Sequence, residues 1–197
     1  MEKQMIISIG REYGSGGHEI AERISKKYNL PIYDHNFLDE LCQKKNLDKN
    51  LLAEFDEAKI NKLFSRTVKG LNNSPAYNVA NLQFEFLKEL AEEGKSFVVV
   101  GRCSEYVLRN YDALFSVFIY SNTKARAERL SKKLHITEKE ATNMMYLKDA
   151  KRKKYHDAHS PIRWGKPKGY DLCIDSSSLG IDKTLDLLCS YIDIKYC

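Results

Sequence analysis

A glycine-rich segment near the N-terminus is the first part of the chain whose residue types suggest chemistry. It follows an apolar run that ends at Gly10, and a helical pattern comes after it. Its residues are Gly14, Ser15, Gly16 and Gly17. Glycine lets backbone N–H groups face a phosphate, and the N-terminus of the following helix adds a partial positive charge. The position predicts a phosphate-binding loop; the alternative is a turn whose glycines only permit close packing.

The loop departs from the Walker A motif, G-x-x-x-x-G-K-[ST]. Gly17 stands at the lysine position and His18 at the Ser/Thr position. Five residues, one more than in the motif, separate Gly10 from Gly16. Arg11 is a candidate for the missing positive charge. His18 is either a contact for a phosphate oxygen or an exposed residue at the start of a helix.

A dinucleotide-binding motif is the main rival interpretation of the same loop. Asp34 ends the second expected strand about 20 residues further on, where that motif places a ribose-binding acid. The third glycine of G-x-G-x-x-G is replaced by Glu19, however, and a glutamate there would obstruct the packing of helix on strand. The loop therefore favours phosphate binding over dinucleotide binding.

The elements that must position this loop alternate between β and α patterns. Short apolar runs predict strands at residues 5–9, 30–33, 97–100, 115–120 and 171–175. Helical spacing and capping residues predict helices at residues 18–28, around 106–107, from 123 to about 134, from 137 onward and at 181–192 after a serine turn. Such alternation, with strands apolar on both faces, predicts an α/β fold of three αβα layers around a parallel sheet.

Residues 36–93 interrupt this alternation with a polar, helical pattern that breaks between Gly70 and Pro75. Apolar residues at helical spacing predict a helix over residues 79–93, with Gly94 as its stop. The chain as a whole is expected to form one domain, residues 1–197. Residues 36–94 are expected to be a helical region on the side of the site where a phosphate acceptor would bind.

Composition excludes several other classes of protein. The chain has 197 residues, of which 43% are hydrophobic and 30% charged, enough for a sizeable core. No apolar run approaches the ~20 residues that a membrane span needs, and the N-terminus lacks a signal-peptide pattern. The five cysteines contain no C-x-x-C pair, which favours reduced thiols in a cytoplasmic protein over a zinc site or a disulfide framework.

The net charge of +5 is concentrated in one segment. Residues 148–168 carry eight Lys/Arg and two acids, whereas the remaining chain is nearly neutral. A basic segment punctuated by Gly and Pro before the last strand suits a lid that closes over phosphate, and the alternative is a solvated basic face. A single basic flap suits a small polyphosphate better than a long nucleic acid.

Two further groups of residues have spacings found in functional sites, but neither is expected to form one. Cys103 and Arg109 have the C-x5-R spacing of a phosphatase cradle, but the intervening residues lack glycine and include Glu105, so this interpretation would need a depressed Cys103 pKa. His156 and His159 share a helix face, but no third strong ligand follows, so no metal site is expected among protein residues.

Together these segments resemble the cytidylate kinase-like family, relatives of bacterial cytidylate kinase among the P-loop kinases. The resemblance covers nearly the whole chain. Its carriers are residues 7–17, Tyr33-Asp34, residues 99–103, residues 117–120 with Arg126 and Arg129, Asp149 with Arg152, and residues 170–176. It implies a P-loop kinase fold with a central five-stranded parallel sheet, a basic lid, ATP with Mg²⁺, and a nucleoside monophosphate or a similar acceptor.

The resemblance also implies roles for individual residues. Gly14 to Gly17 would cradle the donor phosphates, and Ser176 would lie near the adenine. Asp34 would lie near the acceptor, and Arg102 would hold the acceptor phosphate. Arg152, oriented by Asp149, would neutralise charge on the transferred group. Because region 36–93 does not resemble the acceptor-binding insert of true cytidylate kinases, specificity for CMP is not implied.

Two functions are therefore expected. The first is an ATP-dependent phosphotransferase that acts on a small phosphate acceptor. The second is a nucleotide-binding or regulatory module that has kept the fold and lost transfer, which the missing Walker lysine motivates.

Overall fold

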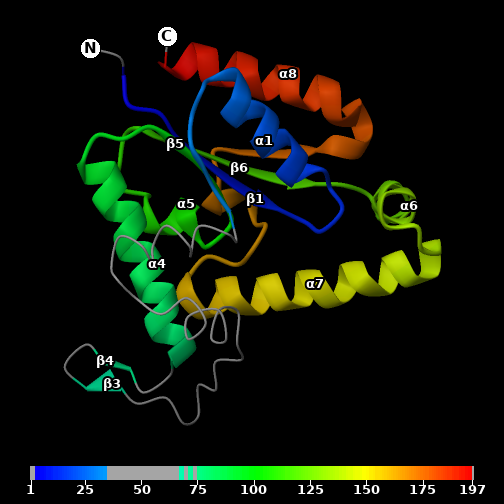
Figure 1. The fold of residues 1–197 in the computed structure, drawn as a ribbon, viewed down its shortest axis with the longest axis horizontal. Helices are drawn as coiled ribbons and strands as arrows, with labels where there is room; N and C mark the ends of the chain where they lie inside the picture. Colours follow the sequence, from blue (N-terminus) through cyan, green and yellow to red (C-terminus); the bar gives the residue numbers. More distant parts are fainter. Residues whose placement is uncertain (1–2, 35–66, 69–70, 73–74, 197) are drawn as a thin grey trace.

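The computed structural model of the chain describes residues 3–34, 67–68, 71–72 and 75–196. Five parallel strands form its central sheet in the order β2-β5-β1-β6-β7 (Figure 1). They are β1 (Ile6–Arg11), β2 (Ile32–Tyr33), β5 (Phe97–Val100), β6 (Leu114–Tyr120) and β7 (Leu172–Asp175). Strand β1 pairs with both β5 and β6, so it is the central strand. The loop that follows it therefore emerges in the middle of the row formed by the carboxyl ends of the strands.

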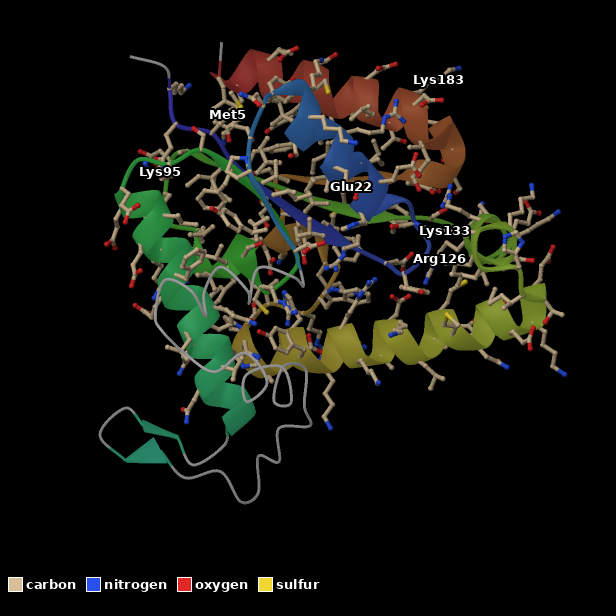
Figure 2. All side chains as sticks on the ribbon, viewed as in Figure 1. Met5, Glu22, Lys95, Arg126, Lys133 and Lys183 are labelled. Atoms are coloured by element: carbon tan, nitrogen blue, oxygen red, sulfur yellow. The ribbon has the colours of Figure 1, made fainter. Side chains whose placement is uncertain are left out.

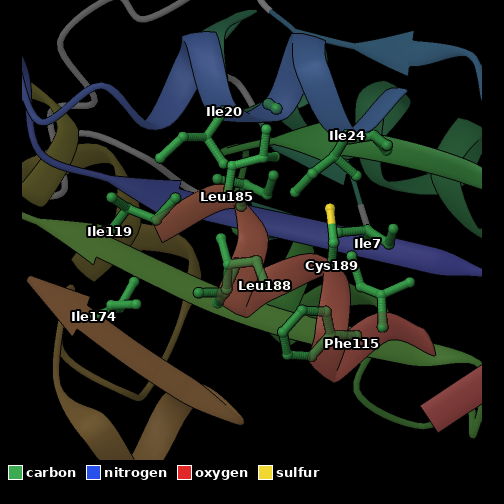
Figure 3. Close-up of a cluster of buried hydrophobic side chains, with 14 of the residues drawn as sticks. Ile7, Ile20, Ile24, Phe115, Ile119, Ile174, Leu185, Leu188 and Cys189 are labelled. Carbon is green, nitrogen blue, oxygen red and sulfur yellow. The ribbon is translucent and has the colours of Figure 1, made fainter. Parts of the chain in front are cut away.

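Helices cover both faces of this sheet. On one face α1 (Gly17–Lys27) and α8 (Ser176–Tyr196) pack their apolar sides against the strands. Figure 3 shows this layer, in which Ile20 and Ile24 of α1 meet Leu185 and Leu188 of α8 above β1 and β6. Burial of these fully apolar side chains supplies most of the driving force that holds α1, and therefore its N-terminus, against the sheet.

The opposite face is covered by α4 (Pro75–Glu92) and the short α5 (Ser104–Val107). Phe86 and Leu87 of α4 lie in one buried cluster with Ile6, Phe97 and Val99 of the strands. Alternate residues of each strand thus enter the two cores, as the period of two in a strand requires.

Two further helices lie beside the carboxyl ends of the strands. Helix α6 (Thr123–Leu134) packs on α7 (Glu138–His159) through Ala127, Leu130 and Met145. Helix α7 begins with a capping box, in which the Glu140 N–H donates to Thr137 Oγ1 at 3.2 Å and the Thr137 N–H donates to Glu140 Oε2 at 2.9 Å. From there it runs the length of the molecule toward α4 (Figure 1).

The predicted three-layer class and its parallel sheet are confirmed, and every predicted strand is present. The serine turn is different from expectation: it is the first turn of α8, because the Asp175 carboxylate accepts the Ser177 N–H at 2.8 Å. Gly180, at φ 75°, then interrupts the helix before the predicted segment 181–192 begins.

The expected helical pattern over 36–93, with its break between Gly70 and Pro75, did not include strands. Strands β3 (Thr67–Val68) and β4 (Leu71–Asn72) pair antiparallel within that region. Strands of two residues are too short for hydrophobic periodicity to detect. The helix predicted over 79–93 is found as α4, which starts earlier, at Pro75, and ends at Glu92. The helices expected between residues 36 and 64 lie outside the described residues.

Across the described part of the chain, every helix is too short or too polar to cross a membrane.

The core between α8 and the sheet offers a matched test of the fold. Leu188 is fully buried, whereas the neighbouring Leu187 is 43% exposed. We expect Leu188→Ala to lower the free energy of unfolding by about 2–5 kcal/mol, because it leaves a cavity in the core. Leu187→Ala should change it by less than about 0.5 kcal/mol. Urea denaturation followed by circular dichroism measures both, and equal losses would contradict this packing.

Candidate functional site

The glycine loop adopts a backbone that only glycine tolerates well. Gly14 and Gly16 both have φ +82°, and Gly16 is the N-cap residue of α1. A Cβ on Gly14 would lie 2.8 Å from Leu130 Cδ1, and one on Gly16 would overlap Ile181. The loop is therefore shaped by packing on α6 and α8, and it leads directly into the N-terminus of α1, where phosphate groups bind well.

A cluster of charges around the buried Arg126 fixes the residues before the loop. Arg126 of α6 pairs with Glu12 Oε2 at 2.9 Å and with the carboxylate of Asp149 on α7. Its Nε–H donates to the Tyr13 carbonyl at 2.8 Å, and the Tyr13 N–H donates to Asp149 Oδ1 at 2.7 Å. The Ser121 N–H donates to Glu12 Oε2 at 3.1 Å. Figure 2 shows Arg126 where α6, α7 and the loop meet. The cluster ties one loop to two helices and to the end of β6.

Arg129 and Ser176 support the loop from two other sides. The guanidinium of Arg129 donates to the Gly14 carbonyl, and burial lowers the pKa of this arginine. The Ser176 hydroxyl donates to the Ser15 carbonyl at 2.6 Å and also lies 3.2 Å from the Tyr120 carbonyl. Ser176 is fully buried, so the structure places it behind the loop, where it holds the loop's backbone.

The loop borders a pocket, here called the loop pocket. Its lining includes Gly14, Gly16, Gly17 and His18 from the loop and α1, Arg129 and Lys133 from α6, and Arg11 and Arg152. Ser15 is fully buried instead, and its hydroxyl donates to the Glu12 carbonyl at 2.9 Å. His18 Nε2 lies 3.4 Å from Glu22 and 3.8 Å from Asp34, which brings the end of β2 next to the start of α1.

The second pocket, the strand-end pocket, lies at the carboxyl ends of β1 and β5. Its lining includes Gly10, Arg11, Gly101, Arg102, Glu105, Lys151, Arg152, Tyr155, His156, Trp164 and Tyr170. Gly101, Arg102 and Cys103 all have positive φ, of 79°, 59° and 53°. Two consecutive residues other than glycine in this conformation store strain, which is typical of functional sites. Asp34 contributes to the lining of neither pocket.

Arg152 lies between the two pockets. Its Nη1 is 3.7 Å from Asp149 Oδ1 and donates to the Arg11 carbonyl at 3.4 Å, and its guanidinium lies 5.3 Å from the centre of the Tyr13 ring. Asp149 lies closer to Arg126 than to Arg152. Its carboxylate thus contacts both the turn before the loop, through the Tyr13 N–H, and Arg152 between the pockets. Sequence reasoning missed several residues as site residues, among them Arg126 and Glu12 of the charge cluster and Arg129 and Lys133 of the loop pocket. The available signal was the i,i+3 spacing of Arg126 and Arg129, which places both on one face of α6.

The sequence predicts the basic segment 148–168 at the end of a helix and in the loop 161–167, and the structure places its first part in α7. Residues 148–159 form the last part of α7, and a 3₁₀ turn (Pro167–Gly169) precedes β7. Trp164 packs edge-on against Phe118 with ring centres 5.2 Å apart, and Arg102 lies 5.8 Å from the centre of the Tyr155 ring. The segment therefore covers the strand-end pocket with both cations and aromatic rings.

A buried His–Glu pair closes the inner end of this pocket. His156 Nε2 lies 2.6 Å from Glu105 Oε1, and both residues are buried. Burial, more than any neighbouring charge, raises the pKa of the Cys103 thiol, which is the opposite of what a phosphatase nucleophile needs. The raised pKa thus argues against a phosphatase site built on Cys103 and Arg109. Within the described residues, no group of three or more His, Cys, Asp and Glu side chains is arranged to hold a metal ion.

A parallel sheet with β1 at its centre, a glycine loop leading into α1 and arginines from α6 and α7 around that loop define a P-loop kinase architecture. Shikimate kinase from Bacteroides thetaiotaomicron shares the fold, with a TM-score of 0.55 at 14% identity over 96% of this chain and 98% of that one. The family model of the cytidylate kinase-like family matches residues 6–178. The chain belongs to this family.

Individual relatives agree with this assignment. Cytidylate kinase from Methanocaldococcus jannaschii is 27% identical over 192 residues, which cover 96% of this chain and 98% of that protein. Cytidylate kinase from Methanococcus vannielii is 25% identical over 93% of this chain and 97% of that protein. The crystal structure of an uncharacterized protein from Eubacterium ventriosum has a TM-score of 0.77 and 32% identity, covering 96% of this chain and 99% of that one.

The charge cluster around the buried Arg126 predicts a large loss of stability when one partner is removed. Arg126→Ala would leave the partly buried carboxylates of Glu12 and Asp149 without their cation. We expect it to lower the free energy of unfolding by about 3 kcal/mol, the low end of the range for buried pairs, because both carboxylates keep some contact with water. Arg23→Ala is the matched control, because its ion pair with Asp182 lies at the surface and should contribute little. Urea denaturation measures both; a small loss for Arg126→Ala would argue against the cluster.

The raised pKa of Cys103 predicts an unreactive thiol. At pH 8 the native protein should show no alkylation of Cys103 by iodoacetamide, whereas the urea-unfolded protein should be alkylated there. Since the unfolded thiol ionises first, this residue should also make the fold less stable as pH rises above the ordinary thiol pKa of about 8.5. Peptide mass spectrometry measures the alkylation, and rapid native labelling would contradict the prediction.

Proposed function

We propose that this protein transfers the terminal phosphoryl group of ATP to a nucleoside monophosphate or a related small phosphate acceptor. The observation that carries the proposal is that the loop pocket and the strand-end pocket meet at two shared cations, Arg11 and Arg152. These two side chains would therefore lie beside a phosphoryl group that passes from one pocket to the other.

The loop pocket suits the donor. Gly14, Gly16 and Gly17 bring backbone close to the ligand at the N-terminus of α1, and Arg129 and Lys133 add positive charge. Magnesium would be carried chiefly on the donor phosphates, because Glu12 and Asp149 are already paired with Arg126. When bound, the ion neutralises charge between the phosphates. Such use of ATP fits a cytoplasmic enzyme.

The strand-end pocket suits an anionic acceptor. Arg102 and Lys151 join the two shared arginines there, whereas Glu105 is engaged with His156. Arg102 would hold the acceptor phosphate in a bidentate manner, as guanidinium groups do. Asp34, beside His18 at the end of β2, would contact the acceptor from the adjoining side. The segment 148–168 would serve as the lid.

Transfer of this kind depends on position and charge rather than on covalent steps by the protein. Arg152 would neutralise the charge that spreads over the moving phosphoryl group, and Asp149 would keep Arg152 in place. The second candidate function, a nucleotide-binding regulatory module without transfer, is favoured by one observation: glycine stands at the Walker lysine position.

A coupled assay with Mg·ATP and each common nucleoside monophosphate tests the proposal. We expect turnover with at least one acceptor. Arg102→Gln should lower kcat/KM for that acceptor by about 100-fold or more, because an arginine that binds the transferred or accepting phosphate is removed. Arg23→Ala is the control, because Arg23 lies on the surface of α1, pairs with Asp182 and lines neither pocket, so the rate should be unchanged.

Calorimetry separates the two candidate functions. ATP binding without turnover on any acceptor would favour the regulatory module over the kinase. If the protein neither binds ATP nor shows turnover, both candidates are wrong.

A further inference from the structure

The side chain of Arg11 occupies the place that a side chain at position 17 would need. A Cβ built on Gly17 would lie 2.6 Å from Arg11 Cβ and 3.2 Å from Arg11 Cγ. Real Cβ atoms do not approach other carbons so closely. A side chain at position 17 and the stem of Arg11 could therefore be accommodated together only if the backbone shifted, so the glycine at the Walker lysine position and Arg11 at the end of β1 are structurally coupled.

The far end of the same side chain lies against a second glycine. A Cβ on Gly101 would overlap Arg11 Nη1, and Gly101 has φ +79°. The Arg11 stem thus starts over the first turn of α1, at Gly17, and its guanidinium ends at the carboxyl end of β5. This path leads from the loop pocket to the strand-end pocket, and Arg11 contributes to the lining of both.

Arg11 brings a positive charge to the lining of both pockets. The adjacent Glu12 is neutralised by Arg126 at 2.9 Å. Arg152 binds the backbone carbonyl of Arg11, which brings a second guanidinium beside it. Two arginines at the junction of two pockets create a positive field at the point where an anionic group would pass.

We propose that Arg11 replaces the Walker lysine, delivering from the end of β1 the charge that a lysine would deliver from the start of α1. The inference rests on the proposed function and adds the residue that contacts the transferred phosphoryl group. Arginine suits this role because its planar fork presents several N–H donors, enough to bind an oxygen of the donor and one of the acceptor together.

A charge-relocation experiment tests this directly. Arg11→Gly removes the stem from the space over Gly17, and Gly17→Lys then has room to restore a Walker lysine. The set comprises Arg11→Gly, the double variant Arg11→Gly/Gly17→Lys, and Arg11→Gly/Gly17→Met as a control of similar length without charge. Arg11→Gln, which keeps the stem and removes the charge, is the second variant in case Arg11→Gly does not fold.

Two readouts are measured: kcat with Mg·ATP, and the dissociation constants of ATP and ADP by calorimetry. Arg11→Gly or Arg11→Gln should lower kcat by about 100-fold or more and weaken ATP binding more than ADP binding, because only ATP carries the transferred group. Adding Gly17→Lys to Arg11→Gly should recover at least about tenfold of the lost rate, whereas adding Gly17→Met should recover none.

The outcomes distinguish this inference from the proposed function. If the wild-type protein neither binds ATP nor turns over, the proposed function is wrong and the inference is wrong with it. If the wild-type protein is active and Arg11→Gln equals it in kcat and in the ratio of ATP to ADP affinity, only the inference is overturned. Equal recovery with lysine and methionine at position 17 would also overturn it, because packing rather than charge would then explain the effect.

Discussion

The ion cluster of Arg126, Glu12 and Asp149 is the interaction on which the site depends. The side chain of Arg126 in α6 is buried, and it pairs with the partly buried carboxylates of Glu12, after β1, and Asp149, in α7. An unpaired charge is costly in such a place. Each partner thereby fixes the position of the others. This cluster also positions the glycine loop. Immediately before the loop, the backbone of Tyr13 forms hydrogen bonds with both Arg126 and Asp149.

The two pockets follow from the order of the strands. Strand β1 is central, so the loop after it is flanked by α6, which follows β6, and by the turn after β5. The carboxyl ends of parallel strands are where α/β folds bind ligands. At these carboxyl ends, Arg11 and Arg152 lie between the two pockets. The loop pocket has the glycine backbone on one side, and the strand-end pocket has the strained backbone around Arg102 on the other. Two adjacent pockets with shared arginines are the arrangement that the proposed transfer of a phosphoryl group needs.

Sequence reasoning predicted the fold well because its signals are local. Buried parallel strands appear as continuous apolar runs, such as residues 97–100, and the Thr137/Glu140 capping box marks the start of α7 without reference to the rest of the chain. The site was predicted less completely. Nothing local shows that Arg126 is buried beside Glu12, that Ser176 supports the loop from behind, or that Arg11 fills the space over Gly17, since each contact joins segments brought together only by the sheet.

Helix α7 contributes to both halves of the site. Asp149 binds the turn before the glycine loop, and one to two turns later Tyr155 and His156 line the strand-end pocket. Because these residues lie on one continuous helix, a ligand that shifts α7 in one pocket also alters contacts in the other. The two binding equilibria are then thermodynamically linked, and linkage is reciprocal: whatever factor the first ligand applies to the affinity of the second, the second applies to the first. If both pockets bind a ligand, α7 is the element that would carry such linkage between them, because it reaches both pockets.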